Sequence, residues 1–205
     1  VLMNMGMSGQ AALDVQKEIA TEAVKSGLSQ SKALEMIASS SSTISTYFQG
    51  NTEELKKATI QAVKLGVELD DMGRIAESLI DFESSIASQF EFQALTGKNI
   101  NLDLARQLAL QGDIAGATQE VLNQVGDINE FNQLDFMAKQ RLADATGMSI
   151  EQMAKALSLE EQRSRLGSDL VDQAQDLGVS AEELSEMSAD QVQAKLEEAQ
   201  AQKKI

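Results

Sequence analysis

Apolar residues recur every three or four positions along most of the chain, the spacing that gives a helix one apolar face. Glycine followed closely by a small polar residue interrupts this pattern at short intervals. Such a glycine ends one helix, and the following Ser, Asp or Asn begins the next. The pattern predicts an all-α fold, a multi-helix array of short helices with glycine turns and one long central helix. The expected helices are 9–26, 30–40, 52–65, 70–96, 102–111, 113–125, 133–146, 150–158, 160–177 and 181–204.

The clearest helix boundaries are GMSIEQ at 147–152 and GVSAEE at 178–183. In each segment the glycine supplies the left-handed residue that ends a helix, and the apolar residue after it closes a Schellman contact. The serine then caps the next helix, and Gln or Glu three positions later completes a capping box. Local chemistry therefore predicts these boundaries without reference to tertiary contacts.

The longest expected helix, at 70–96, carries an apolar stripe with alternating three- and four-residue spacing. The stripe consists of Met72, Ile75, Leu79, Phe82, Ile86 and Phe90. This spacing is typical of a coiled-coil seam, although sustained coiled coils extend over about three or four heptads and this stripe is shorter. We interpret the stripe either as the buried face of a central core helix or as a seam between identical subunits.

Composition divides the chain into three expected parts. The serine run at 39–42 and Gly50-Asn51 are candidate linkers, so we expect an N-terminal helical segment at 1–50 and a central helical domain at 51–158. Beyond it acidic residues become frequent, and a helix this polar projects into solvent or packs through a narrow stripe. We expect an acidic tail at 159–205, helical and extended rather than part of the core. Its sparse apolar positions are Leu166, Leu170, Val171, Leu177, Leu184, Val192 and Leu196.

The residue types that are missing limit the possible chemistry. The 205 residues include no His, Cys or Pro. Without His and Cys the chain lacks the usual neutral-pH base, a thiolate nucleophile and the commonest transition-metal ligands. The acidic pairs at 70–71 and 182–183 lie at the start of expected helices, where negative charge complements the helix dipole. We expect no enzymatic activity, no catalytic residue, no metal site and no cofactor.

The formal net charge of −15 restricts the possible partners. A nucleic-acid binder needs a basic face that displaces phosphate counterions, so no direct nucleic-acid binding is expected. The longest apolar runs are far shorter than the ~20 residues that span a bilayer. The chain begins Val1-Leu2-Met3, without an initiator methionine or a charged leader, which predicts a segment of a longer chain.

From about 71 to 157 the sequence carries an ordered set of segments that points to a known family. The segments are RIAESLIDFESSI at 74–86, ALTGKNINL at 94–102, ARQLALQGD at 105–113 and QRLA at 140–143, followed by GMS at 147–149 and QM at 152–153. In this order they resemble a region of bacteriophage tail tape measure proteins, notably those of marine and other environmental phages. The likeness covers somewhat under half of the chain and carries over no catalytic or binding residue.

This resemblance implies a structural virion protein. Tape measure proteins assemble as several copies inside the growing tail tube, set its length and leave when DNA is delivered. A homo-oligomer (trimer or hexamer) in the virion tail is implied, assembled in the host cytoplasm with other tail proteins of the tube, tip or baseplate. Frequent glycine does not suit a continuous rod, so we expect a compact domain. The alternative is an acidic helical adaptor or scaffold that binds a partner through narrow apolar stripes; it explains the composition but not the ordered likeness.

Overall fold

The computed structural model describes residues 8–179, 184, 187 and 189–202 of the chain. Every regular element in this described part is a helix, which confirms the all-α fold class. The helices are α1 (Gly9–Lys25), α2 (Gln30–Ser39), α3 (Ser41–Tyr47), α4 (Thr52–Leu65), α5 (Leu69–Ile80), α6 (Phe82–Thr96), α7 (Asp103–Leu110), α8 (Ile114–Val125), α9 (Ile128–Gln133), α10 (Phe136–Thr146), α11 (Ile150–Leu166), α12 (Ser168–Asp176) and α14 (Ala189–Gln202).

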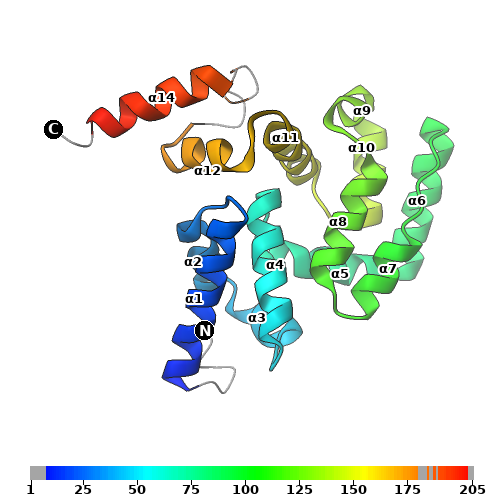
Figure 1. Cartoon of the computed structure of the whole chain (residues 1–205). Coiled ribbons are helices and arrows are strands. Elements are labelled where there is room, and N and C mark those ends of the chain that lie inside the picture. Colours follow the sequence, from blue (N-terminus) through cyan, green and yellow to red (C-terminus); the bar gives the residue numbers. More distant parts are fainter. Residues whose placement is uncertain (1–7, 180–183, 185–186, 188, 203–205) are drawn as a thin grey trace.

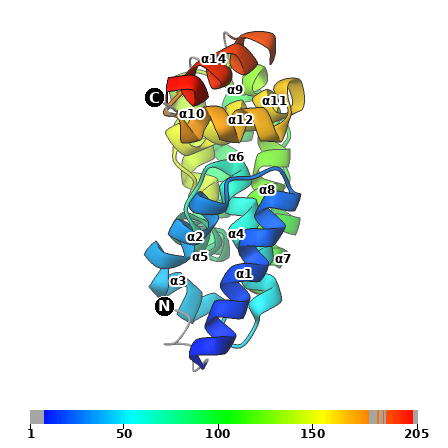
Figure 2. The same ribbon diagram turned by 60° about the vertical axis from the view of Figure 1, so that its left-hand side comes forward.

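The helix α5 lies at the centre of the arrangement (Figure 1). It packs against α3, α4, α6, α7, α8 and α10. The N-terminal helices α1 and α2 pack on α4, and the pair formed by α6 and α10 makes the opposite edge of the molecule. The helices α12 and α14 pack on each other beyond α11 and form a separate layer (Figures 1 and 2).

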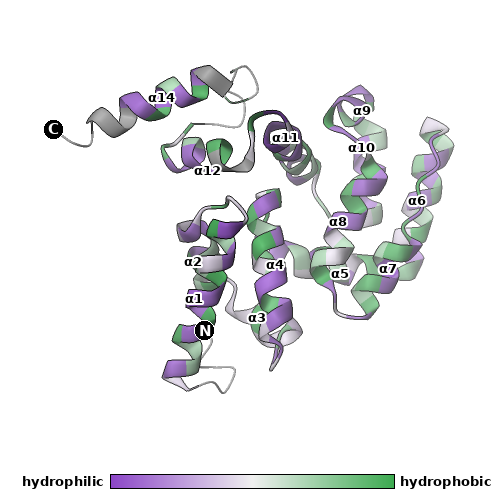
Figure 3. Cartoon of the chain, viewed as in Figure 1, coloured by the Kyte–Doolittle hydropathy of each residue, from purple (hydrophilic) through white to green (hydrophobic). Residues whose placement is uncertain are grey.

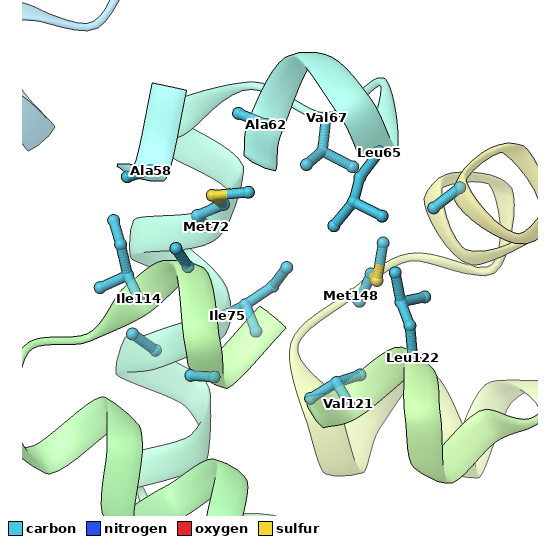
Figure 4. Close-up of a cluster of buried hydrophobic side chains, with 14 of the residues drawn as sticks. Ala58, Ala62, Leu65, Val67, Met72, Ile75, Ile114, Val121, Leu122 and Met148 are labelled. Carbon is cyan, nitrogen blue, oxygen red and sulfur yellow. The ribbon is translucent and has the colours of Figure 1, made fainter. Parts of the chain in front are cut away.

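One hydrophobic cluster holds the body of the protein together and extends from Ala12 to Leu157. Figure 4 shows its centre, where aliphatic side chains of α4, α5 and α8 meet Met148. Small residues such as Ala58 and Ala62 lie among them, and small side chains let neighbouring helices pack closely. The cluster includes residues on both sides of position 50, so α1, α2 and α3 share this core with the helices that follow.

Glycine turns join the helices, as the sequence predicts. Gly66 has a φ of 66°, and the N–H groups of Gly66 and Val67 donate to the carbonyls of Val63 and Ala62 at 3.2 and 3.1 Å. This pair of hydrogen bonds is the Schellman motif. The capping box of Ser149 is present at the start of α11. The corresponding serine and glutamate at 180 and 183 lie outside the described residues.

The single long helix predicted at 70–96 is wrong, because α5 and α6 are separate helices that meet at Asp81. Asp81 has a φ of −75° and a ψ of 75°, so the chain turns there. Its N–H donates to the carbonyl of Glu77 at 3.2 Å, and its carbonyl accepts from the N–H of Ser85 at 2.9 Å. The first bond closes the last turn of α5, and the second closes the first turn of α6. The bend lets α6 take its own rotation, so the apolar spacing that crosses Asp81 does not make one continuous stripe.

Other boundaries also differ from the prediction. The serine run at 39–42 leads into α3 instead of a linker, and α3 packs on α5, with the Thr43 hydroxyl donating to Asp70. The helix predicted at 133–146 corresponds to α10, and the short helix α9 before it was not predicted. The helix α11 continues unbroken to Leu166, through the break predicted near 159. The serine-rich composition predicted a linker, but this segment forms the helix α3 and packs on α5.

The acidic C-terminal part packs on itself, so the expected extended tail is not confirmed. Polar contacts tie this part to the body. Arg163 Nε donates to the carbonyl of Lys64 at 3.1 Å, and Lys32 Nζ donates to Gln175 Oε1 at 2.8 Å. The sparse apolar positions form a second, smaller core. Its buried residues are Leu159, Leu166, Val171, Ala174, Val179, Leu184, Val192 and Leu196.

We expect Gly147→Ala to destabilise the protein more than Gly112→Ala. Both glycines have positive φ, 73° and 81°, so alanine adds roughly 1 kcal/mol of backbone strain at either position. A Cβ at Gly147 would lie 2.4 Å from Ser78 Cβ, whereas nothing lies within 4 Å of a Cβ at Gly112. This overlap should add about 1–3 kcal/mol. Thermal unfolding followed by circular dichroism measures the difference, and equal melting temperatures would contradict the close approach at Gly147.

Candidate interaction surface

The helix α6 exposes several large apolar side chains and buries two polar ones. Phe82, Ile86 and Phe90 are spaced four residues apart and are 43, 38 and 62% exposed. We call these three residues the outer stripe. Monomeric proteins rarely expose large contiguous apolar patches, and such a patch is typical of an interaction surface. The residues that α6 buries instead are Ser85, Gln89 and Phe92.

Further exposed apolar side chains lie near the C-terminal end of α6. The helices α6 and α10 are antiparallel, because the Ser85 hydroxyl donates to the carbonyl of Ala145 at 2.7 Å while Arg141 Nε pairs with Glu91 at 2.9 Å. The start of α10 therefore lies beside the end of α6. Figure 3 shows hydrophobic positions along α6 at this edge of the molecule. The exposed apolar residues of this end are Leu95, Phe136 and Met137.

A buried polar network holds the inner face of α6. Arg106 of α7 is 4% exposed, and its Nη2 donates to Gln89 Oε1 at 2.8 Å and to Ser85 Oγ at 3.1 Å. Its Nη1 pairs with Asp103 at 3.1 Å. Gln89 Nε2 donates in turn to the carbonyl of Ile100 at 2.9 Å. These partners make the burial of a charged guanidinium tolerable.

Burial lowers the pKa of Arg106, and the carboxylate of Asp103 acts in the opposite direction. An arginine side chain stays protonated in proteins even when its pKa falls, because the pKa starts so high. The network therefore places a permanent positive charge between α6 and α7. An apolar side chain at position 106 would need no hydrogen-bond partners, whereas the guanidinium needs Ser85 and Gln89, which α6 turns inward.

The structure divides the predicted seam between the interior and the surface. Met72, Ile75 and Leu79 lie on α5 and are fully buried in the core. The outer stripe lies on α6, beyond the bend at Asp81, and faces solvent. The first half of the seam is therefore core of the chain itself, and only the second half is available for contact with another subunit.

A charged cleft of about 560 Å³ is lined by residues of α2, α4, α5, α11 and α12. The acidic pair Asp70 and Asp71 lies in its wall, and Asp71 pairs with Arg74. Lys32 donates to Gln175 across it, and burial lowers the pKa of this lysine. Within the described residues no group of three or more carboxylates could hold a metal ion. Contacts inside the protein account for Lys32, Asp70, Asp71 and Arg74 among the cleft's charged side chains.

Sequence reasoning found the outer stripe and missed the network behind it. Arg106 and Ser85 are 21 positions apart, and no local pattern connects them. One local signal was present, because Ser85 and Gln89 stand four residues apart and therefore share one face of the helix. Two polar residues at this spacing mark a polar face beside the apolar one.

Comparisons with known proteins add no further assignment. No family model, curated protein or solved structure matches this chain. Among the helices that the structure describes, none is both long enough and apolar enough to cross a membrane.

Proposed function

We propose that this chain is a segment of a bacteriophage tail tape measure protein, a structural virion protein without enzymatic activity. It helps to assemble the phage tail and to set its length, and it is released during DNA delivery. It acts as a homo-oligomer, a trimer or hexamer, together with other tail proteins of the tube, tip or baseplate. Its place is the virion tail, after assembly in the host cytoplasm, without direct binding to nucleic acid.

Two independent features support this proposal. The first is the ordered likeness of residues 71–157 to tape measure proteins, a region that spans α5 to α10 and half of α11. The second is the outer stripe on α6, which lies inside that region and presents aromatic side chains to solvent. A protein that assembles in several copies needs such an apolar contact surface. The exposed stripe is the single observation that carries the assembly role.

The helix lengths favour a compact domain of the tape measure over its measuring rod. Helices α1 and α11 have 17 residues each, which corresponds to about 25 Å at about 1.5 Å per residue. A continuous rod would need much longer uninterrupted helices. We therefore assign this segment to a folded domain within the longer protein, which joins copies through α6.

The alternative function is an acidic helical adaptor or scaffold that binds a different protein through the same stripe. The observation that favours it is the folded body of the chain, which buries its own core without help from a partner. The two functions differ in solution, because an adaptor is a monomer until its partner is added. They also differ in virions, where only a tail protein is present.

We expect the isolated chain to form a trimer or hexamer in light scattering at near-physiological salt. Replacing Phe90 with serine removes the most exposed aromatic of the outer stripe and should lower the mass to that of a monomer. Val24→Ser is the matched control, because Val24 is 60% exposed on α1, away from α6. A monomer at every concentration for the unchanged chain would contradict assembly through identical subunits and favour the adaptor.

The tail assignment needs a separate test. We expect the chain to remain with tail tubes when it is produced together with the tube subunits encoded by the same genome. Sedimentation followed by immunoblotting measures this association. A chain that oligomerises but never sediments with the tubes would keep the assembly role and remove the tail role.

A further inference from the structure

The orientation of α6 needs a physical cause. Apolar burial favours the rotation that turns Phe82, Ile86 and Phe90 toward the core, since burying such side chains is the main driving force of folding. The structure instead buries the polar residues Ser85 and Gln89 together with Phe92. Some interaction besides the burial of Phe92 must therefore help to hold the helix in the orientation that leaves Phe82, Ile86 and Phe90 outside.

The two faces of α6 are related by a simple rotation. Successive residues of an α-helix are separated by about 100° around its axis. Ile86 follows Ser85, and Phe90 follows Gln89, so a turn of about 100° would place the apolar pair where the polar pair now lies. The same turn would move Phe92 out of the core. The helix thus has two plausible orientations, and the partner of its inner face selects one of them.

We propose that the buried network of Arg106, Ser85 and Gln89 fixes the rotation of α6 and thereby keeps the outer stripe on the surface. Arg106 is a positioning residue for the contact with a second copy of the chain. This inference rests on the proposed assembly role for its biological meaning, but the rotation itself is a property of the single chain.

The hydrogen bonds of the network explain why one orientation is selected. Arg106 donates to both Ser85 and Gln89, which a rotated α6 would carry away from it. The same rotation would take hydrogen-bond donors from the carbonyls of Ala145 and Ile100, which Ser85 and Gln89 now satisfy. Arg106 would keep its pairing with Asp103, but its Nε and Nη2 groups and the carbonyl of Ala145 would lose their partners, which opposes the gain from burying the stripe.

The test replaces the network with apolar side chains and reads the rotation of α6 by thiol reactivity. The triple variant Ser85→Ala/Gln89→Leu/Arg106→Met removes the polar side chains together, so no charged group is left buried without its partner. The chain has no cysteine, which makes a single introduced thiol a clean reporter. Phe90→Cys reports the outer face, and Phe92→Cys reports the inner face.

With the network intact, we expect the thiol of Phe90→Cys to react quickly with a maleimide and that of Phe92→Cys slowly. In the triple variant the order should reverse, with a change of about tenfold or more at each position, because a buried group reacts only when it opens to solvent. Loosening of α6 would instead make both thiols reactive. Opposite changes at the two positions are therefore the signature of rotation.

Three controls keep the outcome clear. Val24→Cys on α1 should react equally in both backgrounds, and circular dichroism should show that helix content is retained. Reactions are run at a concentration where light scattering shows a monomer, so a subunit contact cannot protect the thiol. A folded triple variant with unchanged reactivity, or with both thiols more reactive, would overturn the proposal. This readout is independent of oligomer mass, so the assembly role can fail while the rotation holds, or the reverse.

Discussion

Replacing Leu79 with aspartate is expected to unfold the body of the protein. Leu79 lies on α5, the central helix, and its side chain is fully buried. It belongs to the hydrophobic cluster, where a carboxylate would lose its water, and an uncompensated buried charge costs at least about 4 kcal/mol. This loss is comparable to the whole stability of many domains, about 5–15 kcal/mol. Circular dichroism and urea titration measure the change.

Ile80→Asp is the matched control for this variant. Ile80 is the next residue on the same helix and is 42% exposed, so its carboxylate can remain hydrated. We expect a change within about 1 kcal/mol for a substitution at such a surface position. An unchanged melting temperature and unchanged oligomer mass for Leu79→Asp would show that α5 does not occupy the core as described.

Replacing Asp172 with leucine is expected to release the C-terminal layer while the body stays folded. Asp172 Oδ1 accepts from Arg163 Nη2 at 2.6 Å, and each side chain is only 5% exposed. Removing one partner of a buried ion pair leaves the other charge uncompensated and costs about 3–5 kcal/mol. The second core is small, so it cannot absorb this loss. Hydrogen exchange should show loss of protection in α12 and α14 and retained protection in α4, α5 and α8.

The double variant Arg163→Met/Asp172→Leu separates the charge effect from packing. Removing both charges together leaves no unpaired charge, so protection of α12 and α14 should return toward the level of the unchanged chain, apart from the lost bond between Arg163 and the carbonyl of Lys64. If Asp172→Leu unfolds α5 along with α12, the two cores form one cooperative unit. If it leaves α12 protected, the ion pair does not hold the layer in place.

Local sequence determined the fold class and most helix boundaries. Glycine at 66 and 147 supplies the left-handed conformation that ends a helix, and Ser149 caps the next one through bonds to its own neighbours. These interactions involve residues a few positions apart, so the sequence shows them directly. The absence of His and Cys likewise follows from composition alone and limits the chemistry that any fold of this chain can perform.

The candidate site was predictable only in part. Periodicity placed Met72, Ile75, Leu79, Phe82, Ile86 and Phe90 on one continuous stripe, whereas the structure divides them between a face of α5 and a face of α6. It could not show that the bend at Asp81 separates the two faces, because the backbone remains hydrogen-bonded on both sides of the bend. The direction of each face depends on packing partners that lie elsewhere in the chain.

Only the tertiary structure decided which face of α6 points outward and how the acidic tail packs. Helical periodicity defines two faces of a helix, but a distant partner selects the buried one. For α6 that partner is Arg106, 21 residues from Ser85. For the acidic tail the partners are the helices α11, α12 and α14 themselves. Their sparse apolar residues form a core only when the three helices pack together. Local sequence sets the helices because their bonds are local, whereas the rotation and the layering of helices arise from contacts between distant segments.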